Sequence, residues 1–432
     1  LSTPFYGVGL KVYDMLAGKR GLGSTQMASS SQTLKMASSL KSAGLKGGVV
    51  YWDGQFDDAR LALALARTAQ QNGALLLNYC AVENLQSQDT KSAALQSLKV
   101  KDQFTGQTFE VQAKCFVNAT GVWVDDIRNM DANAQSSQGN QGGIAKTVEP
   151  MVQASQGIHL VVDRSFWPHD HALIVPKTSD GRVLFVIPWL GKTILGTTDT
   201  ARADAPLEPR PLDSEVEFIL HHAEIYLNNA PKAKDVLSSW VGLRPLVKPP
   251  STADQATKSV SREHTIVKSD SGLVTVTGGK WTTYRAMADD TLAFISKHGL
   301  LPYTPLPKNG LSQNFALVGA QGNTVSTQKI TQAQGPHIYG NEANFVAQLP
   351  GADIVLHEKI TEAMVRFAVR YEYACTVEDV LARRFRFLFT DAQTAKQLAP
   401  QVAEILLQEG IQNPQTEAFI ELCNTYLKLS QA

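Results

Sequence analysis

The sequence is poor in cysteine, balanced in charge and without a long apolar run, and each absence excludes a class of protein. Four cysteines are spread along 432 residues with no CxxC pair, so we expect free thiols in a reducing compartment rather than a disulfide framework. Lysine plus arginine equals aspartate plus glutamate at 40 each, so the overall charge does not favour nucleic acid as a partner. No run of about 18 apolar residues appears that could cross a membrane as a helix.

The first residues also lack a recognisable opening. Residues 1–10 carry no initiator methionine and no charged stretch leading into an apolar run, so they do not resemble a signal peptide. Gly7-Val8-Gly9 begins like a dinucleotide-binding fingerprint, but Val12 stands where the third glycine belongs and no strand precedes it. We therefore reject this stretch as a nucleotide-binding turn.

One stretch combines the features of a ligand-binding turn. Gly278-Gly279-Lys280 follows a predicted alternating strand over 273–277 and precedes a predicted helix over 286–297. Two glycines at a strand end let the backbone approach a ligand without an intervening Cβ, and the start of a helix presents free N–H groups and a positive dipole end. A solvated strand-to-helix turn with a basic end is the structural alternative.

A second turn of small residues, Asn118-Ala119-Thr120-Gly121, follows a short predicted strand over 114–117. Open α/β sheets bind ligands at the carboxyl ends of their strands, which makes this turn a second candidate. A tight turn without a ligand fits the same residues.

The remaining pattern predicts an α/β region, an antiparallel sheet and a helical C-terminal region. Short strands with tight turns over 158–162, 172–175, 183–188 and 193–196 are typical of antiparallel pairing. Three prolines over 301–307 indicate a boundary, and beyond about 327 the pattern is helical throughout. Other predicted elements are a strand at 49–53, a helix at 58–71 capped by Asp57 and buried nearly all round, a buried strand at 74–81, a hairpin of 95–100 with 109–111, a loop at 131–143, and a helix opened by a capping box at 214–217.

Two arginines stand near small or apolar residues without obvious acidic partners. Arg244 precedes a proline in an apolar context, and Arg262 opens the stretch Arg262-Glu263-His264. Isolated guanidinium groups suit two-point binding of phosphate or carboxylate. The alternative is a structural ion pair, for example between Arg262 and Glu263 or Asp254.

His159 and Asp199 are weaker candidates. His159 is flanked by apolar residues, so a core histidine with a satisfied hydrogen bond is the default and a general base the alternative. Asp199 follows two threonines at a strand end, where it can orient Lys280 or Arg244 or simply form an Asx turn.

Two histidine pairs have spacings that a metal site can use. No third ligand accompanies either pair, so we interpret them as surface residues and predict no metal; the pairs are His169 with His171 and His221 with His222.

Six motifs in order carry a resemblance to one family. They are YWDGQFDDAR at 51–60, NATG at 118–121, KTSDGR at 177–182, GTTD at 196–199, RPL at 244–246 and GGKWTTYR at 278–285. Through them nearly the whole chain resembles the FAD-dependent glycerol-3-phosphate dehydrogenases.

The resemblance implies a fold. It implies the remainder of an FAD-binding Rossmann-like domain over 1–306, with an antiparallel substrate-binding sheet at about 145–250, followed by a C-terminal helical domain over 312–432. The family opens with a glycine-rich βαβ unit, which takes about 30 residues. Because this unit is missing here, we expect an N-terminally truncated fragment that binds FAD weakly or not at all, although its intact parent binds it.

The resemblance also implies roles for residues. Arg244 and Arg262 hold the substrate phosphate, and Lys280 faces the flavin and the substrate hydroxyls. The cofactor-binding residues implied are Val82, Ala119, Thr120, Gly121, Gly278, Gly279, Lys280 and Thr282. The family's preferred base lies in a His-Gly-Gly motif that this chain lacks, so His159 ranks second, with Lys280 and Asp199 as the other catalytic candidates.

The activity implied is oxidation of sn-glycerol 3-phosphate to dihydroxyacetone phosphate, with FAD as cofactor and quinone as electron acceptor. A cytoplasmic location, peripheral at the inner face of the cell membrane, and a possible homodimer go with it. An oxidase that uses oxygen, or a non-catalytic fragment with a phosphate-binding surface, are the alternatives. Amphipathic segments at 6–16 and 33–45 and the basic stretch 383–386 are candidates for lipid contact; ordinary surface helices are the simpler interpretation of the first two.

Overall fold

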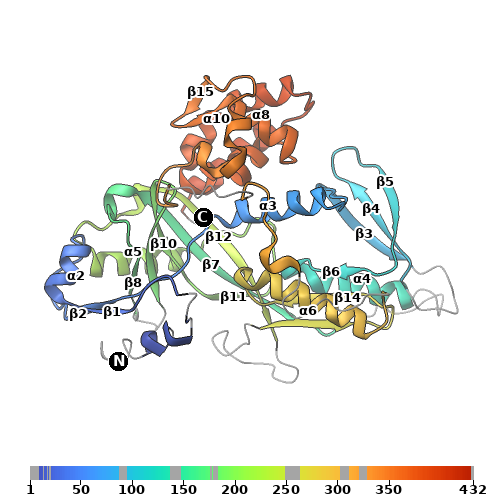
Figure 1. Ribbon diagram of the computed structural model, residues 1–432, viewed down its shortest axis with the longest axis horizontal. Helices are drawn as coiled ribbons and strands as arrows, with labels where there is room; N and C mark the ends of the chain where they lie inside the picture. The colour runs from blue at the N-terminus through green and yellow to red at the C-terminus, as the bar shows by residue number, and fades with distance from the viewer. Residues whose placement is uncertain are drawn as a thin grey trace.

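The computed structural model describes residues 9–12, 14–16, 18, 21–86, 95–136, 147–175, 178, 183–248, 263–301, 311–320 and 328–429. Figure 1 shows a large sheet at one side, a smaller α/β region at the other and a helical domain above both. This mixed α/β fold with a helical C-terminal domain confirms the predicted fold class.

The large sheet is antiparallel throughout, as its short strands and tight turns predict. Its strand order is β11-β7-β10-β9-β8, and β12 also pairs with β7. Helix α5 (Asp213–Tyr226) covers one face, where Ile158, Leu160 and Ile219 are fully buried. The strands are β7 (Val152–Asp163), β8 (Leu173–Val175), β9 (Leu184–Trp189), β10 (Lys192–Gly196), β11 (Thr200–Arg202) and β12 (Val236–Val247), with short 3-10 turns η3 (Arg164–Phe166) and η4 (Ala233–Asp235).

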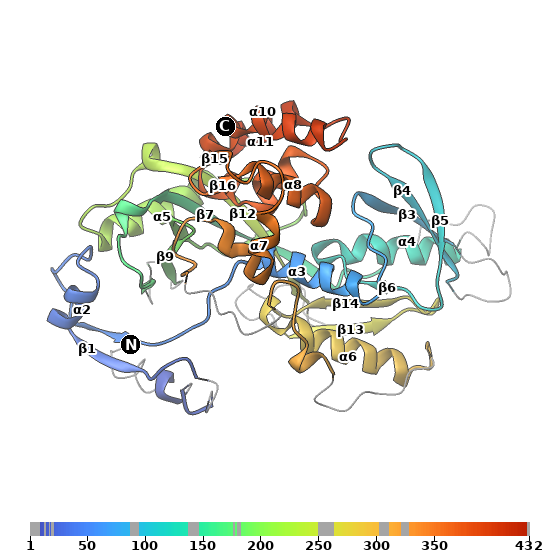
Figure 2. The same cartoon turned by 45° about the horizontal axis from the view of Figure 1, so that its top comes forward.

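The smaller region contains the two predicted ligand-binding turns. Strand β6 (Val117–Asn118) lies parallel to β14 (Val274–Gly278), and β13 (His264–Lys268) pairs antiparallel with β14. Figure 2 shows helices α4 and α6 on opposite sides of this sheet. These helices are α4 (Val124–Ser136), which follows η2 (Gly121–Trp123), and α6 (Tyr284–Lys297), which follows η6 (Trp281–Thr283).

A meander of three strands extends from this region. The predicted hairpin forms β4 (Ser97–Asp102) and β5 (Thr108–Gln112), and β3 (Cys80–Gln86) pairs with β4. The predicted strand at 74–81 is wrong over most of its length, because only its last two residues enter β3. Leu75 and Leu77 are 85% and 55% exposed, and within the described ranges no strand pairs with them. Apolar composition alone does not make a strand without a hydrogen-bonded neighbour.

Three other predicted elements need correction. Residues 131–136 continue α4 instead of forming a loop, and 137–146 lie outside the described residues. Helix α2 (Ser30–Met36) stops well short of the predicted 45, between strands β1 (Gln26–Ser29) and β2 (Gly47–Val50). Helix α5 begins at Asp213, with Glu215 rather than Glu217 bonded back to the Leu212 N–H.

The C-terminal domain is helical, as predicted, but it also contains a short hairpin that the sequence did not indicate. Its core includes Phe367, Phe385 and Phe419 and extends to Val161 and Trp189 of the large sheet. The elements are η7 (Leu311–Asn314), η8 (Pro336–Glu342), α7 (Ala343–Val346), β15 (Val355–His357), β16 (Ile360–Thr361), α8 (Glu362–Tyr371), the π-helix η9 (Asp379–Arg384), α9 (Phe387–Thr390), α10 (Ala392–Gln408) and α11 (Thr416–Leu427).

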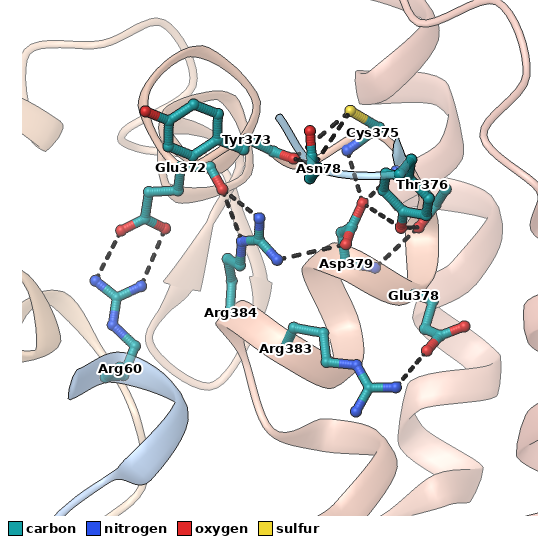
Figure 3. A network of polar contacts seen from close by, with 11 residues as sticks. Arg60, Asn78, Glu372, Tyr373, Cys375, Thr376, Glu378, Asp379, Arg383 and Arg384 are labelled. Carbon is teal, nitrogen blue, oxygen red and sulfur yellow. Dashed lines mark hydrogen bonds and ion pairs between the residues drawn. The ribbon is translucent and has the colours of Figure 1, made fainter. Parts of the chain in front are cut away.

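Helix α3 (Asp58–Gln71) packs against the C-terminal domain through ion pairs of Arg60 with Glu372 and of Arg67 with Glu342. Its predicted bounds and Asp57 cap are confirmed, with the cap oxygen 3.1 Å from the Arg60 N–H. Its leucines are only half-buried, contrary to expectation, because arginines make the interdomain contact: Arg60 Nη2 lies 2.8 Å from the buried Glu372 carboxylate. Figure 3 shows this pair, with Arg384 folded onto the Glu372 carbonyl.

The same contacts argue against lipid binding by the basic stretch 383–386. Arg384 and Arg386 are each only 8% exposed, and Arg383 Nη2 lies 2.6 Å from Glu378. Arg383, whose side chain is 41% exposed, is paired with Glu378, so the stretch presents one partly exposed guanidinium rather than a basic patch. Across the part of the chain that the structure describes, no helix has both the length and the apolarity to cross a bilayer.

Candidate active site

The two glycine turns lie side by side because β6 and β14 are parallel neighbours. The Thr277 hydroxyl donates to the Gly121 carbonyl at 3.3 Å, and the Asn118 amide donates to Thr275 at 3.3 Å. Gly121 has a φ of +65°, and a Cβ built there meets nothing within 4 Å. The structure therefore brings the predicted residues Ala119, Thr120 and Gly121 to the same sheet edge as Gly278.

The Gly278 turn also contacts the large sheet. Gly278 and Gly279 have φ values of +78° and +70°, a region that side chains rarely adopt. A Cβ on Gly278 would lie 2.7 Å from Val247 Cγ2, at the end of β12. This packing puts the Lys280 turn next to the strand that carries Arg244, three residues before Val247.

Lys280 and Thr282 are exposed at the start of the helical segment. The Lys280 N–H donates to Thr283 Oγ1 at 3.4 Å, which closes the turn, and the roles of Lys280 and Thr282 toward a cofactor stay predictions. Val82 packs with Leu85, Phe116 and Leu273 in a small core beside β6, and its cofactor role likewise stays a prediction.

Arg244 lies in a nest of polar groups on the face of the large sheet opposite α5. Its guanidinium donates to Thr198 O at 3.2 Å and Thr197 Oγ1 at 3.3 Å, and lies 3.6 Å from Asp199 Oδ1. Arg244 thus has an acidic partner, and Asp199 lies where it can orient Arg244, one of the alternatives expected for it. The side chain is 37% exposed, so it is partly accessible from solvent.

Neighbouring residues shape this nest. The Ser155 hydroxyl donates to Asp199 Oδ1. Gly157 lies beneath the guanidinium: a Cβ there would come within 2.4 Å of Arg244 Nη2 and 2.6 Å of Thr197 Oγ1. The glycine therefore provides the space that the arginine occupies.

A buried carboxylate holds the nest from behind, and sequence reasoning missed it. Glu215, 4% exposed, accepts from Gln156 at 2.5 Å, Thr198 at 2.8 Å and Thr200 at 2.7 Å. These bonds fix the strand end that carries the partners of Arg244. The available signal was an acidic residue in the first turn of a predicted helix, which indicates a cap but not a tertiary contact.

His159 lies on the same face as Arg244. It pairs with Gly196 on β10 and Trp240 on β12, and its ring stacks on Trp240 with centroids 4.2 Å apart. Burial, with a smaller contribution from the Arg244 charge, lowers the pKa of His159 from 6.5 to about 3. The imidazole is therefore neutral at physiological pH, with a free nitrogen lone pair but a weaker basicity than an ordinary histidine.

Some predicted residues are not brought to this site. Arg262 and most of the 177–182 motif lie outside the described residues. His169 Nε2 and the Ser39 hydroxyl are hydrogen-bonded at 2.9 Å. His222 is 2% exposed inside α5, so the interpretation as a surface residue was wrong for His222. Within the described ranges no group of three or more histidine, cysteine or acidic side chains could hold a metal, and the absence of a metal stays a prediction.

A cavity adjoins Gly121 on the α5 side of the large sheet. Its volume is about 290 Å³, and it is lined mainly by apolar groups of Trp123, Leu207, Val241 and Leu243. Arg244 lies on the opposite face of β12, so the cavity and the phosphate nest are separate features.

A glycine edge for a large cofactor, beside a sheet that presents an arginine and a neutral histidine, is typical of flavin oxidoreductases. Residues 8–285 match the family model described as FAD dependent oxidoreductase, and residues 311–414 match the C-terminal domain of alpha-glycerophosphate oxidase. The chain belongs to the FAD-dependent oxidoreductase family.

Two similar proteins within this family are named as glycerol-3-phosphate dehydrogenases. The chain is 37% identical over 430 residues to mitochondrial glycerol-3-phosphate dehydrogenase of Mus musculus, covering 94% of this chain and 56% of that protein. It is 36% identical to the probable mitochondrial enzyme of Caenorhabditis elegans, covering 99% and 59%. The chain therefore spans under two thirds of the length of these curated relatives.

One solved structure supports the same assignment. The glycerol-3-phosphate dehydrogenase of Bacillus halodurans, complexed with FAD, superposes with a TM-score of 0.70 at 26% identity. The match covers 94% of this chain and 79% of that one.

Proposed function

We propose that the chain is the catalytic part of an FAD-dependent glycerol-3-phosphate dehydrogenase, which oxidises sn-glycerol 3-phosphate to dihydroxyacetone phosphate. The observation that carries the proposal is the position of Arg244, partly exposed in its nest, on the same sheet face as the neutral His159. A phosphate binder and a proton acceptor are the two groups that this reaction needs from the protein. The names of the relatives support the substrate.

The glycine edge fits FAD. Gly121, Gly278 and Gly279 all have positive φ, which side chains rarely adopt, and a Cβ on Gly121 would meet nothing within 4 Å, as close approach of a pyrophosphate requires. We assign these glycines with Ala119, Thr120 and Val82 to the cofactor, together with Thr282 and the N–H groups of η6. When bound, FAD supplies the two-electron oxidant that receives a hydride from the substrate carbon.

The side chains of the chain supply binding and proton transfer. The Arg244 guanidinium binds the substrate phosphate, and it is preorganised by Thr197, Thr198 and Asp199. The neutral His159 accepts the proton of the C2 hydroxyl as the carbon loses hydride. Lys280, at the glycine turn beside β12, stabilises negative charge that develops as the proton leaves.

Two electron acceptors fit this chemistry. The relatives are named dehydrogenases, which favours a quinone acceptor and, with it, a peripheral position at a membrane surface. The match of residues 311–414 to the C-terminal domain of alpha-glycerophosphate oxidase favours oxygen instead. Hydrogen peroxide release, compared with reduction of a quinone-linked dye, distinguishes the two.

Anaerobic titration of the flavin-loaded protein tests the proposal. We expect sn-glycerol 3-phosphate to bleach the flavin absorbance, and glycerol at the same concentration to bleach it far more slowly. Equal rates with both compounds, or no bleaching although FAD is bound, contradict the assigned substrate.

A further inference from the structure

Two buried nitrogen atoms on the Arg244 face of the large sheet have no hydrogen-bond partner within the described ranges, His159 Nδ1 and Trp240 Nε1. They belong to two stacked rings, 4.2 Å apart and inclined by 21°. We propose that Trp240 is a positioning residue that holds the His159 imidazole for proton transfer, and that Phe389 of the helical domain holds Trp240. The proposal rests on the proposed function in taking His159 as the proton acceptor.

The His159 ring is enclosed from two sides. Trp240 on β12 covers one face, and on the other neighbouring strand Gly196 leaves room for the ring. A Cβ on Gly196 would lie 2.6 Å from His159 Cδ2 and 3.2 Å from Nε2. Since Nδ1 makes no hydrogen bond in the described structure, ring packing fixes the orientation of the imidazole.

Trp240 is in turn packed against the C-terminal domain. Phe389 of α9 meets it edge to face, with centroids 5.5 Å apart and planes at 88°. Phe389 is held by the Arg386 guanidinium, 4.3 Å from its centroid, and by an edge contact with Tyr426 at 5.7 Å. The helical domain therefore reaches the histidine through two aromatic rings.

This packing also sets the charge of the imidazole. Trp240 excludes water from one ring face, which disfavours the charged form. The charged groups around His159 are Arg244 on β12, which opposes protonation, and Asp199 beyond β10, whose charge Arg244 partly neutralises. Behind Phe389 the nearest charge is Arg386, 3.6 Å from Asp58. The described groups that face the ring therefore favour its neutral form while Trp240 is in place.

Histidine NMR on the flavin-loaded protein tests the proposal. With ¹³C-labelled histidine, nine signals are expected, and His159→Gln identifies the relevant one. Trp240→Leu should raise the pKa of His159 from about 3 to about 4 or 5, toward the ordinary value of 6.5. Trp240→Phe keeps a stacking ring, so the pKa of His159 in this variant should differ from the wild-type pKa by no more than about 0.5. Trp189→Leu is the matched control, since Trp189 is 6% exposed in the same core and contacts Arg386 rather than His159.

Phe389→Leu provides a second test if Trp240→Leu does not fold. It leaves Trp240 in place and should shift the His159 signal and its pKa in the same direction by a smaller amount. The acid limb of the kcat/KM profile for sn-glycerol 3-phosphate should move with the NMR value. An unchanged His159 titration in both variants, or an equal shift in Trp189→Leu, overturns the proposal. A shifted titration in a protein that does not oxidise sn-glycerol 3-phosphate instead refutes the proposed function and leaves the ring contact standing.

Discussion

Gly157→Ala is expected to damage phosphate binding without unfolding the protein. The added Cβ would lie 2.4 Å from Arg244 Nη2, whereas ordinary contact begins at about 3.4 Å, so the guanidinium must move by roughly 1 Å. Two of the three nearest atoms belong to the flexible end of the Arg244 side chain, which is 37% exposed, and the third is Thr197 Oγ1 at 2.6 Å, which must also shift. Strand β7 itself tolerates alanine, since Gly157 does not have a left-handed φ.

The consequence is a displaced binding group in an intact fold. A misplacement of about 1 Å can cost about a hundredfold in rate, so we expect kcat/KM for sn-glycerol 3-phosphate to fall by about 10- to 100-fold, mostly through KM. The melting temperature should change little. The measurements are steady-state kinetics with a dye acceptor and a thermal melt of the same preparation.

Gly242→Ala is the control. Gly242 pairs with Gly157 across β7 and β12, but a Cβ there meets nothing within 4 Å. It should therefore lose much less activity. A double-mutant cycle decides the mechanism: Gly157→Ala should add almost nothing to Arg244→Ala. Additive losses, or equal losses in the two glycine variants, show that the methyl group acts on something other than Arg244.

Four further results are expected. Arg244→Ala should lower kcat/KM for sn-glycerol 3-phosphate by about 30- to 900-fold, from about 2–4 kcal/mol for one charged contact, and act far less on glycerol in the same assay. Lys280→Ala should lower kcat more than it raises KM, since its charge acts on the transition state. The pKa of His159 is about 3 against 6.5 when unfolded, so the unfolded chain binds the extra proton between these values. The free energy of unfolding should fall as pH drops from 6.5 toward 3, and His159→Gln should weaken that dependence in urea titrations. Arg60→Ala should cost about 3–5 kcal/mol in guanidinium unfolding because Glu372, fully buried, loses its main partner, and a double Arg60→Met, Glu372→Met variant should recover most of that loss.

Local patterns in the sequence were enough to predict much of this fold. Alternation and turn residues identify four of the six strands of the large sheet, β7 to β10, and the β4–β5 hairpin, and a cap residue identifies the start of α3, whereas β11 and β12 were not predicted. These signals act within a few residues of one another, so no tertiary information is needed. The domain boundaries at 306 and 312 stay predictions.

Contacts between distant segments could not be predicted in the same way. The three bonds to Glu215 and the ring contact of Trp240 with Phe389 each join residues from separate elements. The strand prediction at 74–81 failed for the same reason, since apolar residues indicate burial only if a partner is present. The resemblance to a family predicted several site residues, but it did not predict Glu215, Trp240 or Phe389, which pack against or hydrogen-bond to the site residues or their neighbours.

The two halves of the site are built by different means, and this has a consequence for experiments. On the substrate side, Glu215 and the groups around Thr198 fix donors before any substrate arrives, as a charged ligand requires. On the cofactor side, Gly121 provides clearance rather than bonds, because a Cβ there would meet nothing within 4 Å, whereas Gly278 makes room for Val247 of β12. Loss of a polar group behind the nest should therefore change KM for the phosphate substrate with flavin retained. A side chain added at Gly121 should instead change flavin retention first, so the two halves can be perturbed independently in one chain.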